Sequence, residues 1–313
     1  MTKLERKILR IPPIAFIISK SKVIHIPGFK GIPVYDIVKF FFQQIRKVGL
    51  NERASAISYN LIMALPAALL FLFSIVPYLP DSDKFKDQIL GLFNDLSPNS
   101  ASKKFIQQTI EGLLKKQVGV FSFGFLLLMF YASNATMGVI RTFDKSITEN
   151  KKYFLHKRIR AIRLTIVLIL LFLASGLALM GQHQLAILLK GLFHMKRRAE
   201  IPWWNGIRWV IIIALIFYGI SFVYKLGPSV KKRWKLVSPG SILATTLTLS
   251  TTILFSFWVN NFASYNKVYG SIGTVLIIML LIYLNSLILL IGFELNVSIT
   301  YLQAEVEKRK LKE

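Results

Sequence analysis

Long apolar segments separated by short charged ones dominate the sequence and predict helices that cross a membrane. The clearest segment, residues 268–293, has no charged side chain and exceeds the roughly 20 residues that a helix needs to cross a bilayer core. Five further apolar segments have the same character, at about 54–79, 118–140, 164–181, 209–224 and 239–259. The pattern therefore predicts an all-α, polytopic membrane protein with six transmembrane helices.

Two other regions have amphipathic patterns. Residues 34–48 place apolar side chains at the spacing of one helical face, with Lys39, Arg46 and Lys47 on the other side. A helix lying in the membrane interface and a helix packed on the protein's own bundle explain this pattern equally well. Residues 81–117 form a polar insert whose apolar positions predict two short amphipathic helices. The expected organisation is a basic N-terminal segment (1–53), a six-span domain (54–297) with this insert, and a tail (298–313).

The charge distribution predicts how the chain is threaded. The formal net charge is +25, which in a soluble protein would suggest a nucleic-acid partner. Here the lysines and arginines alternate with the spans: 28 fall in the N-terminal segment, the tail and two loops, and 11 fall in the other loops. By the positive-inside rule, both termini are cytoplasmic and no nucleic-acid partner is needed. The 81–117 insert then lies outside the cytoplasm.

Composition excludes several classes of site. The chain is 54% hydrophobic with a mean hydropathy of +0.53, and it has no cysteine, so disulfides and thiolate sites are absent. Its four histidines match no metal-ligand spacing, and no phosphate-binding loop or nucleophile motif occurs. Asp81, Asp83 and Asp87 cluster, but on the predicted outer side. We therefore expect no catalytic residues, no metal, no cofactor and no enzymatic activity.

The last predicted span carries polar residues on two faces. Glu294 follows its apolar core, so the carboxylate should be paired, protonated or close to the headgroups. Tyr283, eleven residues earlier, lies on the same face, while Asn285 and Asn296 share a second face. Two polar faces predict contacts with several helices, which is typical of a central helix in a bundle.

The threading brings four charged residues to the cytoplasmic level: Glu52, Arg53, Arg141 and Glu294. Pairing of Glu294 with Arg53 or Arg141 is the expected arrangement. Such a cluster can serve a transport pathway, or it can be a structural latch between helices, and the latch is the favoured interpretation. Four further residues either line a polar cavity or satisfy one another across helices: Asn60, Asn134, Tyr283 and Asn285.

Two stretches carry a recognisable family pattern, residues 51–74 and residues 238–296. The motif residues of the second stretch are Pro239, Gly240, Tyr265, Asn266, Tyr269, Gly270, Ser271, Gly273 and Asn296. On these motifs the chain resembles the YihY/BrkB family of bacterial inner-membrane proteins over about 45–300. Glu52-Arg53 stands where that family usually has Asp-Arg.

The resemblance implies a multi-pass protein of the bacterial cytoplasmic membrane. It leads us to expect a transporter or flippase of lipid or lipid-linked substrates. An envelope scaffold without transport is the alternative. A ribonuclease is a weaker third, because the family's older label, ribonuclease BN, is in our interpretation a misassignment. The expected partners are membrane lipids, anionic headgroups in particular, together with a second copy of the chain or envelope proteins.

Overall fold

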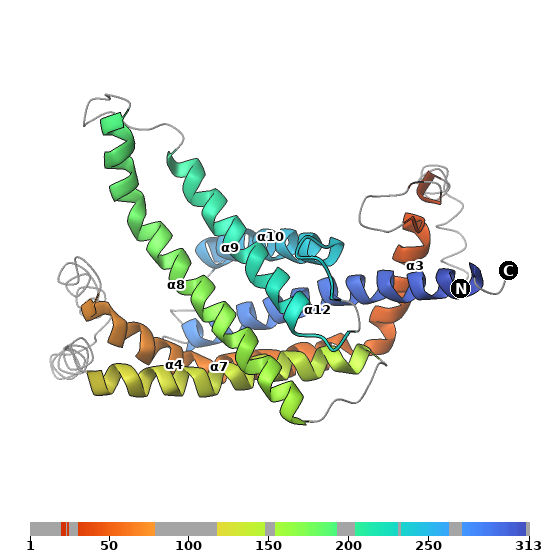
Figure 1. The fold of residues 1–313 in the computed structure, drawn as a ribbon, viewed down its shortest axis with the longest axis horizontal. Helices are drawn as coiled ribbons and strands as arrows, with labels where there is room; N and C mark the ends of the chain where they lie inside the picture. The colour runs from red at the N-terminus through yellow and green to blue at the C-terminus, as the bar shows by residue number, and fades with distance from the viewer. Residues whose placement is uncertain are drawn as a thin grey trace.

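The computed structural model describes residues 20–22, 24, 31–78, 118–147, 154–192, 204–230, 233–262 and 271–310. These residues form α-helices and no strands (Figure 1), which confirms the predicted all-α class. The helices are α3 (Val34–Val48), α4 (Leu50–Ile75), α7 (Val118–Ser146), α8 (Phe154–Leu192), α9 (Trp204–Leu226), α10 (Pro239–Phe262) and α12 (Ser271–Lys310), with a short 3₁₀ turn η1 (Val76–Tyr78) after α4. The predicted insert, 81–117, lies outside the described residues.

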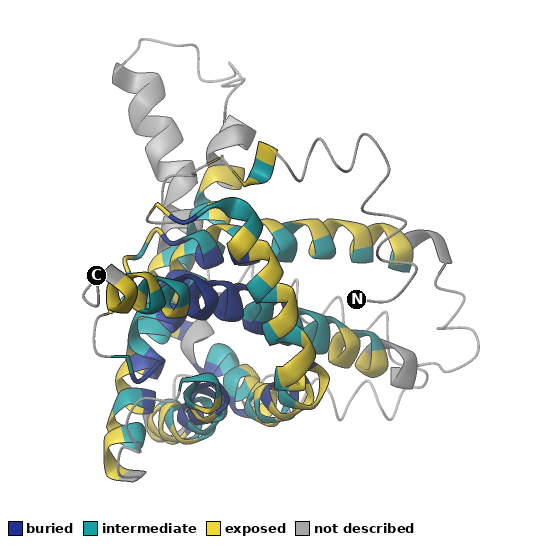
Figure 2. Ribbon diagram, turned by 90° about the vertical axis from the view of Figure 1, so that its right-hand side faces the viewer, coloured by how far each residue is buried: buried dark blue, intermediate teal, exposed yellow. Residues whose placement is uncertain are grey.

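The central element is α12, as its two polar faces predicted. It packs against α3, α4, α7 and α10, and the Tyr224 hydroxyl of α9 donates to the Leu289 carbonyl of α12 at 2.7 Å. Buried residues gather in the middle of the molecule (Figure 2), where these helices meet. The ring of Phe293 stacks on that of Phe143 in α7, with centroids 3.8 Å apart and the planes 3° from parallel.

The start of α10 is fixed by local sequence. Ser238 is the N-cap, since its hydroxyl accepts the Ser241 N–H at 3.2 Å, and Pro239 occupies the first helical position, where no N–H is needed. The Gly240 N–H is satisfied by the Asn296 side-chain oxygen of α12 at 2.9 Å. The first turn of α10 is therefore capped partly by its own residues and partly by α12.

Two glycines allow α10 and α12 to approach closely at this point. A Cβ atom added at Gly240 would overlap the carbonyl oxygen of Gly292. One added at Gly292 would lie 2.5 Å from the Gly240 oxygen and 2.7 Å from the Ala244 Cβ. Small residues commonly let membrane helices pack backbone to backbone in this way.

Gly49 separates α3 from α4. Its φ of 64° is in the left-handed region that favours glycine, and it ends α3 so that α4 begins at the next residue. The sharp turn lays α3 across the C-terminal part of α12, where Ile37 is buried against Leu295 and Ile299. Packing on the protein's own bundle is therefore part of the explanation for the amphipathic pattern at 34–48. Val38 and Phe42 of α3 stay exposed.

Five helices among the described residues are long and apolar enough to cross a membrane, with stretches at Leu50–Ser74, Phe121–Ser146, Trp209–Leu226, Pro239–Val259 and Val275–Arg309. They correspond to five of the six predicted spans. The remaining predicted span, 164–181, lies within α8, whose side chains are described only as far as Ser175. The count of six spans therefore stays a prediction.

Several helices are longer than the hydrophobic segments predicted. The second span was expected to end near 140, but α7 continues to Ser146, and α8 begins at Phe154 and runs without a break to Leu192. Residues 182–192, beyond the predicted third span, thus continue α8. Glu294 was placed near the end of the last span, and α12 continues past it to Lys310 as a helical tail, because charged residues end a membrane span without ending a helix.

Candidate functional site

A buried ion pair joins three helices at one end of the bundle. Arg53 of α4 lies 3.5 Å from Glu294 of α12, measured from Nη1 to Oε1, and the Glu294 residue is 0% exposed. Ser146, the last residue of α7, lies between them: its hydroxyl accepts from Arg53 Nη1 at 2.6 Å and donates to Glu294 Oε1. We call these three residues the buried cluster.

The second carboxylate oxygen of Glu294, Oε2, is buried and has no hydrogen-bond partner. The Gln44 side chain of α3 comes near this carboxylate without reaching hydrogen-bond geometry. Burying a carboxylate oxygen without a hydrogen bond costs free energy in a low-dielectric interior. This oxygen therefore still has the capacity to accept a hydrogen bond. The cluster can therefore accept a further donor from α3 or from a bound molecule.

The sequence predicted one of the two pairings considered for Glu294. The structure brings Arg53 and Glu294 together. Glu52 and Arg141 are exposed side chains on α4 and α7, and neither belongs to the buried cluster. Ser146 was missed because the second span was ended too early. The missed signal was that no glycine or proline lies between Arg141 and Ser146, which should have extended the predicted helix.

A second acidic centre also joins several elements. Asp144 of α7 lies 3.0 Å from Arg160 and 3.6 Å from Lys157, both of α8, and its other oxygen accepts the Ser229 N–H at 3.1 Å. Arg160 also donates to the Gly227 carbonyl at 2.8 Å. This network ties α7 and α8 to the segment between α9 and α10.

We expect Asp144→Ala to destabilise the protein by about 1.5–3 kcal/mol, since hydrogen bonds to charged groups contribute on that order and two cations lose their counter-charge. Thermal unfolding of the purified protein in detergent measures the change. Asp36→Ala is the matched control, because Asp36 is exposed in the first turn of α3, and its loss should stay below about 1 kcal/mol. Equal effects of the two substitutions would contradict a structural role for Asp144.

The four candidate cavity residues each make a different contact. Asn134 accepts from Arg158 of α8 at 2.6 Å, and Asn60 donates to the Ala56 carbonyl of its own helix at 2.7 Å while packing beside Gly138. Asn285 donates to the Leu281 carbonyl at 3.0 Å, and its side-chain oxygen is buried without a partner. Tyr283 packs against the central hydrophobic core. These contacts do not bring the four residues together into one cluster.

The family motif residues fall in two groups. Asn296 connects Gly240 with Ser238, whose hydroxyl accepts from Asn296 Nδ2 at 3.0 Å, so the Pro239-Gly240 and Asn296 motifs form one contact between α10 and α12. Ser271 begins α12 and Gly273 lies in its first turn. The remaining motif residues, Tyr265, Asn266, Tyr269 and Gly270, lie outside the described residues.

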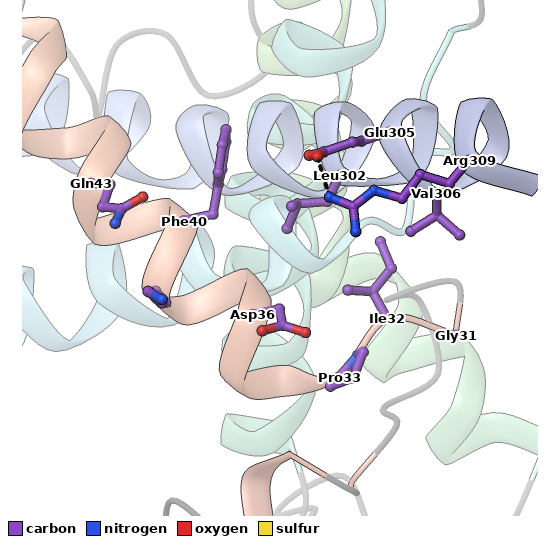
Figure 3. A pocket seen from close by; sticks show the side chains of 11 residues that line it. Gly31, Ile32, Pro33, Asp36, Phe40, Gln43, Leu302, Glu305, Val306 and Arg309 are labelled. Atoms are coloured by element: carbon purple, nitrogen blue, oxygen red, sulfur yellow. Dashed lines mark hydrogen bonds and ion pairs between the residues drawn. The ribbon is translucent and has the colours of Figure 1, made fainter. Parts of the chain in front are cut away.

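Two pockets lie at the crossing of α3 and α12, and Phe40, whose ring stacks on that of Tyr301, lines both. The larger, about 360 Å³, is lined by α3, the residues before it and the tail of α12 (Figure 3). The smaller, about 230 Å³, is lined by Phe40, Gln43, Gln44, Lys47, Ser146, Val297 and Tyr301. Ser146 belongs to both the buried cluster and the smaller pocket, so the pocket lies directly beside the ion pair.

No group of three or more histidine, aspartate or glutamate side chains suited to a metal occurs in the part of the chain that the structure describes. Asp144 and Glu294, the acids of the two networks described above, each form an ion pair with a cation. The arrangement suits interactions between helices and recognition of a charged group.

A family model described as virulence factor BrkB matches residues 41–313. The ribonuclease-like protein YfkH of Bacillus subtilis is 27% identical over 247 residues, which cover 79% of this chain and 88% of that protein. A UPF0761 membrane protein of Xanthomonas campestris is 22% identical over 279 residues, which cover 87% of this chain but only 63% of that protein. Another, of Pseudoalteromonas translucida, is 32% identical over 105 residues, about a third of each chain. No solved structure matches the chain.

Proposed function

Because the chain belongs to the BrkB family, whose model it matches over residues 41–313, we propose that this membrane protein is a transporter or flippase of lipid or lipid-linked substrates. Several of its relatives are named membrane proteins, and the chain itself has five helices able to cross a bilayer among its described residues. The names of the relatives specify no transported substrate, so the proposal depends on the arrangement of the helices.

The observation that carries the proposal is the poor burial of two spans. Within an apolar stretch of 18 residues in each helix, only 11% of the residues of α9 and of α10 are buried, against 44% for α7. The α8–α9 pair diverges from the α4–α7 pair toward the end of the molecule where α8 ends (Figure 1). Large apolar faces are thus left for lipid to contact, and the buried cluster provides polar groups at the level where α4 begins and α7 ends. An apolar path for acyl chains beside polar groups for a headgroup suits lipid movement.

We also propose that the protein is not an enzyme. The name of the Bacillus relative contains the words "ribonuclease-like", but that name describes the relative. Hydrolysis of a phosphodiester by metal ions requires converging carboxylates or histidines. The acids of the described helices that are buried or half-buried, Asp144, Glu294 and Glu305, pair with cations instead of facing one another.

A scaffold that recruits a second copy or another envelope protein is the alternative, since the exposed faces of α9 and α10 could be covered by protein instead of lipid. Translocation assays separate the two. A scaffold leaves lipid distribution unchanged, whereas a flippase moves labelled lipid between leaflets.

The test is reconstitution of the full chain in liposomes that carry a fluorescent lipid, with an impermeant quencher added outside. We expect the wild type to expose more lipid to the quencher than protein-free liposomes do. Glu294→Gln should lose at least about tenfold in rate, the order expected when a hydrogen bond to a charged group is removed. Arg141→Ala is the control, because Arg141 is exposed and outside the buried cluster. Wild-type liposomes indistinguishable from empty ones would refute the proposal.

A further inference from the structure

The two pockets beside α3 differ in charge. Two acids and two cations line the larger one (Figure 3), and the Arg309 guanidinium is engaged by Glu305 at 2.7 Å. Its charges are balanced. None of the seven residues that line the smaller pocket is acidic, and Lys47 gives it a positive charge. Lys47 forms no ion pair with the described residues, so its ammonium is available to a ligand.

We propose that this smaller pocket, between α3, the end of α7 and α12, binds a phosphate group. The inference rests on the proposed function, which it deepens by naming the chemical class of the transported headgroup. The phosphate can belong to a lipid headgroup or to a soluble phosphate ester, and the binding chemistry is the same in both.

The lining supplies donors of the right kind. The Lys47 ammonium has three N–H donors, the Gln43 and Gln44 amides have two each, and Tyr301 has a hydroxyl. A phosphate has several oxygens that accept charge-assisted hydrogen bonds, which are shorter and stronger than neutral ones. Lys47 is exposed at the last turn of α3, so it can reach over the pocket without losing a contact.

The buried cluster does not oppose this preference. Glu294 is opposed by Arg53, so its negative charge does not cancel that of Lys47. Both contacts of Arg53 to the cluster use Nη1, which leaves Nη2 and Nε as further donors. Ser146, which accepts from this guanidinium, is one of the residues that line the pocket. An anion in the pocket thus meets one cation, Lys47, directly, and Arg53 lies behind Ser146, whose own hydrogen is donated to Glu294.

Size and position favour a lipid headgroup as the source. A volume of about 230 Å³ is below the roughly 300–1,000 Å³ of pockets that enclose a drug-sized molecule, so it suits a headgroup and not a whole lipid. Val38 and Phe42, on the same helix as Lys47, are 42% and 56% exposed. Exposed apolar side chains on an amphipathic helix insert at the headgroup boundary, which would place the pocket at that depth.

Binding to the purified full chain in a neutral detergent tests the site. The probes are phosphatidylglycerol and phosphatidylcholine, with native mass spectrometry as the readout. Lys47→Gln should weaken phosphatidylglycerol binding about tenfold, the order expected for one charge-assisted hydrogen bond. Lys39→Gln is the matched control, since Lys39 makes the same charge change on the same helix but lines the other pocket. A larger loss for Lys47→Gln than for Lys39→Gln supports the site, whereas equal losses, no loss or a larger loss for Lys39→Gln overturn it.

Two further arms identify the source and separate this inference from the proposed function. If millimolar glycerol phosphate displaces the lipid from the wild type but not from Lys47→Gln, the ligand is a soluble phosphate ester. If it displaces no lipid, the ligand is a lipid headgroup. Liposomes are assayed in parallel for translocation. Binding that depends on Lys47 without translocation upholds the site and refutes transport. If Lys47→Gln changes neither lipid translocation nor phosphatidylglycerol binding, transport is upheld and the phosphate site is refuted.

Discussion

Arg53→Ala should be among the most damaging single substitutions in this protein, with an expected loss of about 3–5 kcal/mol in the free energy of unfolding. The reason is Glu294, which is 0% exposed and would keep a buried negative charge without a cation beside it, with Ser146 as its hydrogen-bond donor. Glu294→Gln should cost about 1 kcal/mol, because the Arg53 side chain is 14% exposed and can turn toward water. Thermal or denaturant unfolding in detergent measures both.

The double variant Arg53→Ala with Glu294→Gln provides the control. Removing both charges should restore most of the stability lost in Arg53→Ala, since the penalty comes from an unpaired charge and not from the missing contact. If the double variant were less stable than Arg53→Ala, the buried pair would not be the source of the loss.

Gly292→Ala is the second substitution with a large expected effect. The added methyl group would meet the Gly240 carbonyl oxygen at 2.5 Å and the Ala244 Cβ at 2.7 Å, so α10 and α12 must move apart. Separation strains the Asn296 contacts that cap α10 and the Tyr224 bond to α12. We expect a loss of at least about 1–3 kcal/mol, the usual range for overpacking.

Gly219→Ala is the matched control for this prediction. Gly219 lies within α9, and the nearest atom to an added Cβ, a Leu171 methyl, is 3.7 Å away, which is ordinary contact. Because alanine favours a helix over glycine by up to about 1 kcal/mol, this variant should be neutral or slightly more stable. A similar loss of stability in both variants would mean that the close approach of α10 and α12 is not the cause of the loss in Gly292→Ala.

The spans and the central helix could be predicted from the sequence because they depend on local properties. The run at 268–293 has no charge, and the polar spacing of Glu294, Tyr283, Asn285 and Asn296 is that of two helical faces. These properties correctly placed α12 among four other helices. The start of α10 at Pro239 was equally visible, since proline suits the first turn of a helix.

The helix ends and the identity of the cluster could not be read in the same way. Hydropathy marks where a helix leaves the membrane, and α7 continues as a charged helix beyond that point. Ser146 joins the cluster only because α7 has the length that brings its last residue to Glu294. The choice of Arg53 over Arg141 depends on how far each helix is rotated, and charge counting contains no information about rotation. The pocket beside Lys47 arises from the turn at Gly49, which sets the angle between α3 and α12.

Thiol labelling in whole cells tests most directly the claim that the buried cluster and its pocket lie at the cytoplasmic face of a membrane-spanning bundle. The chain has no cysteine, so a single Lys308→Cys substitution on the exposed tail of α12 gives no background. An impermeant maleimide should label this residue in inside-out vesicles and not in intact spheroplasts. Ser100→Cys, in the segment predicted to lie outside, should give the opposite pattern. Labelling of Lys308→Cys from outside the spheroplasts would contradict the account.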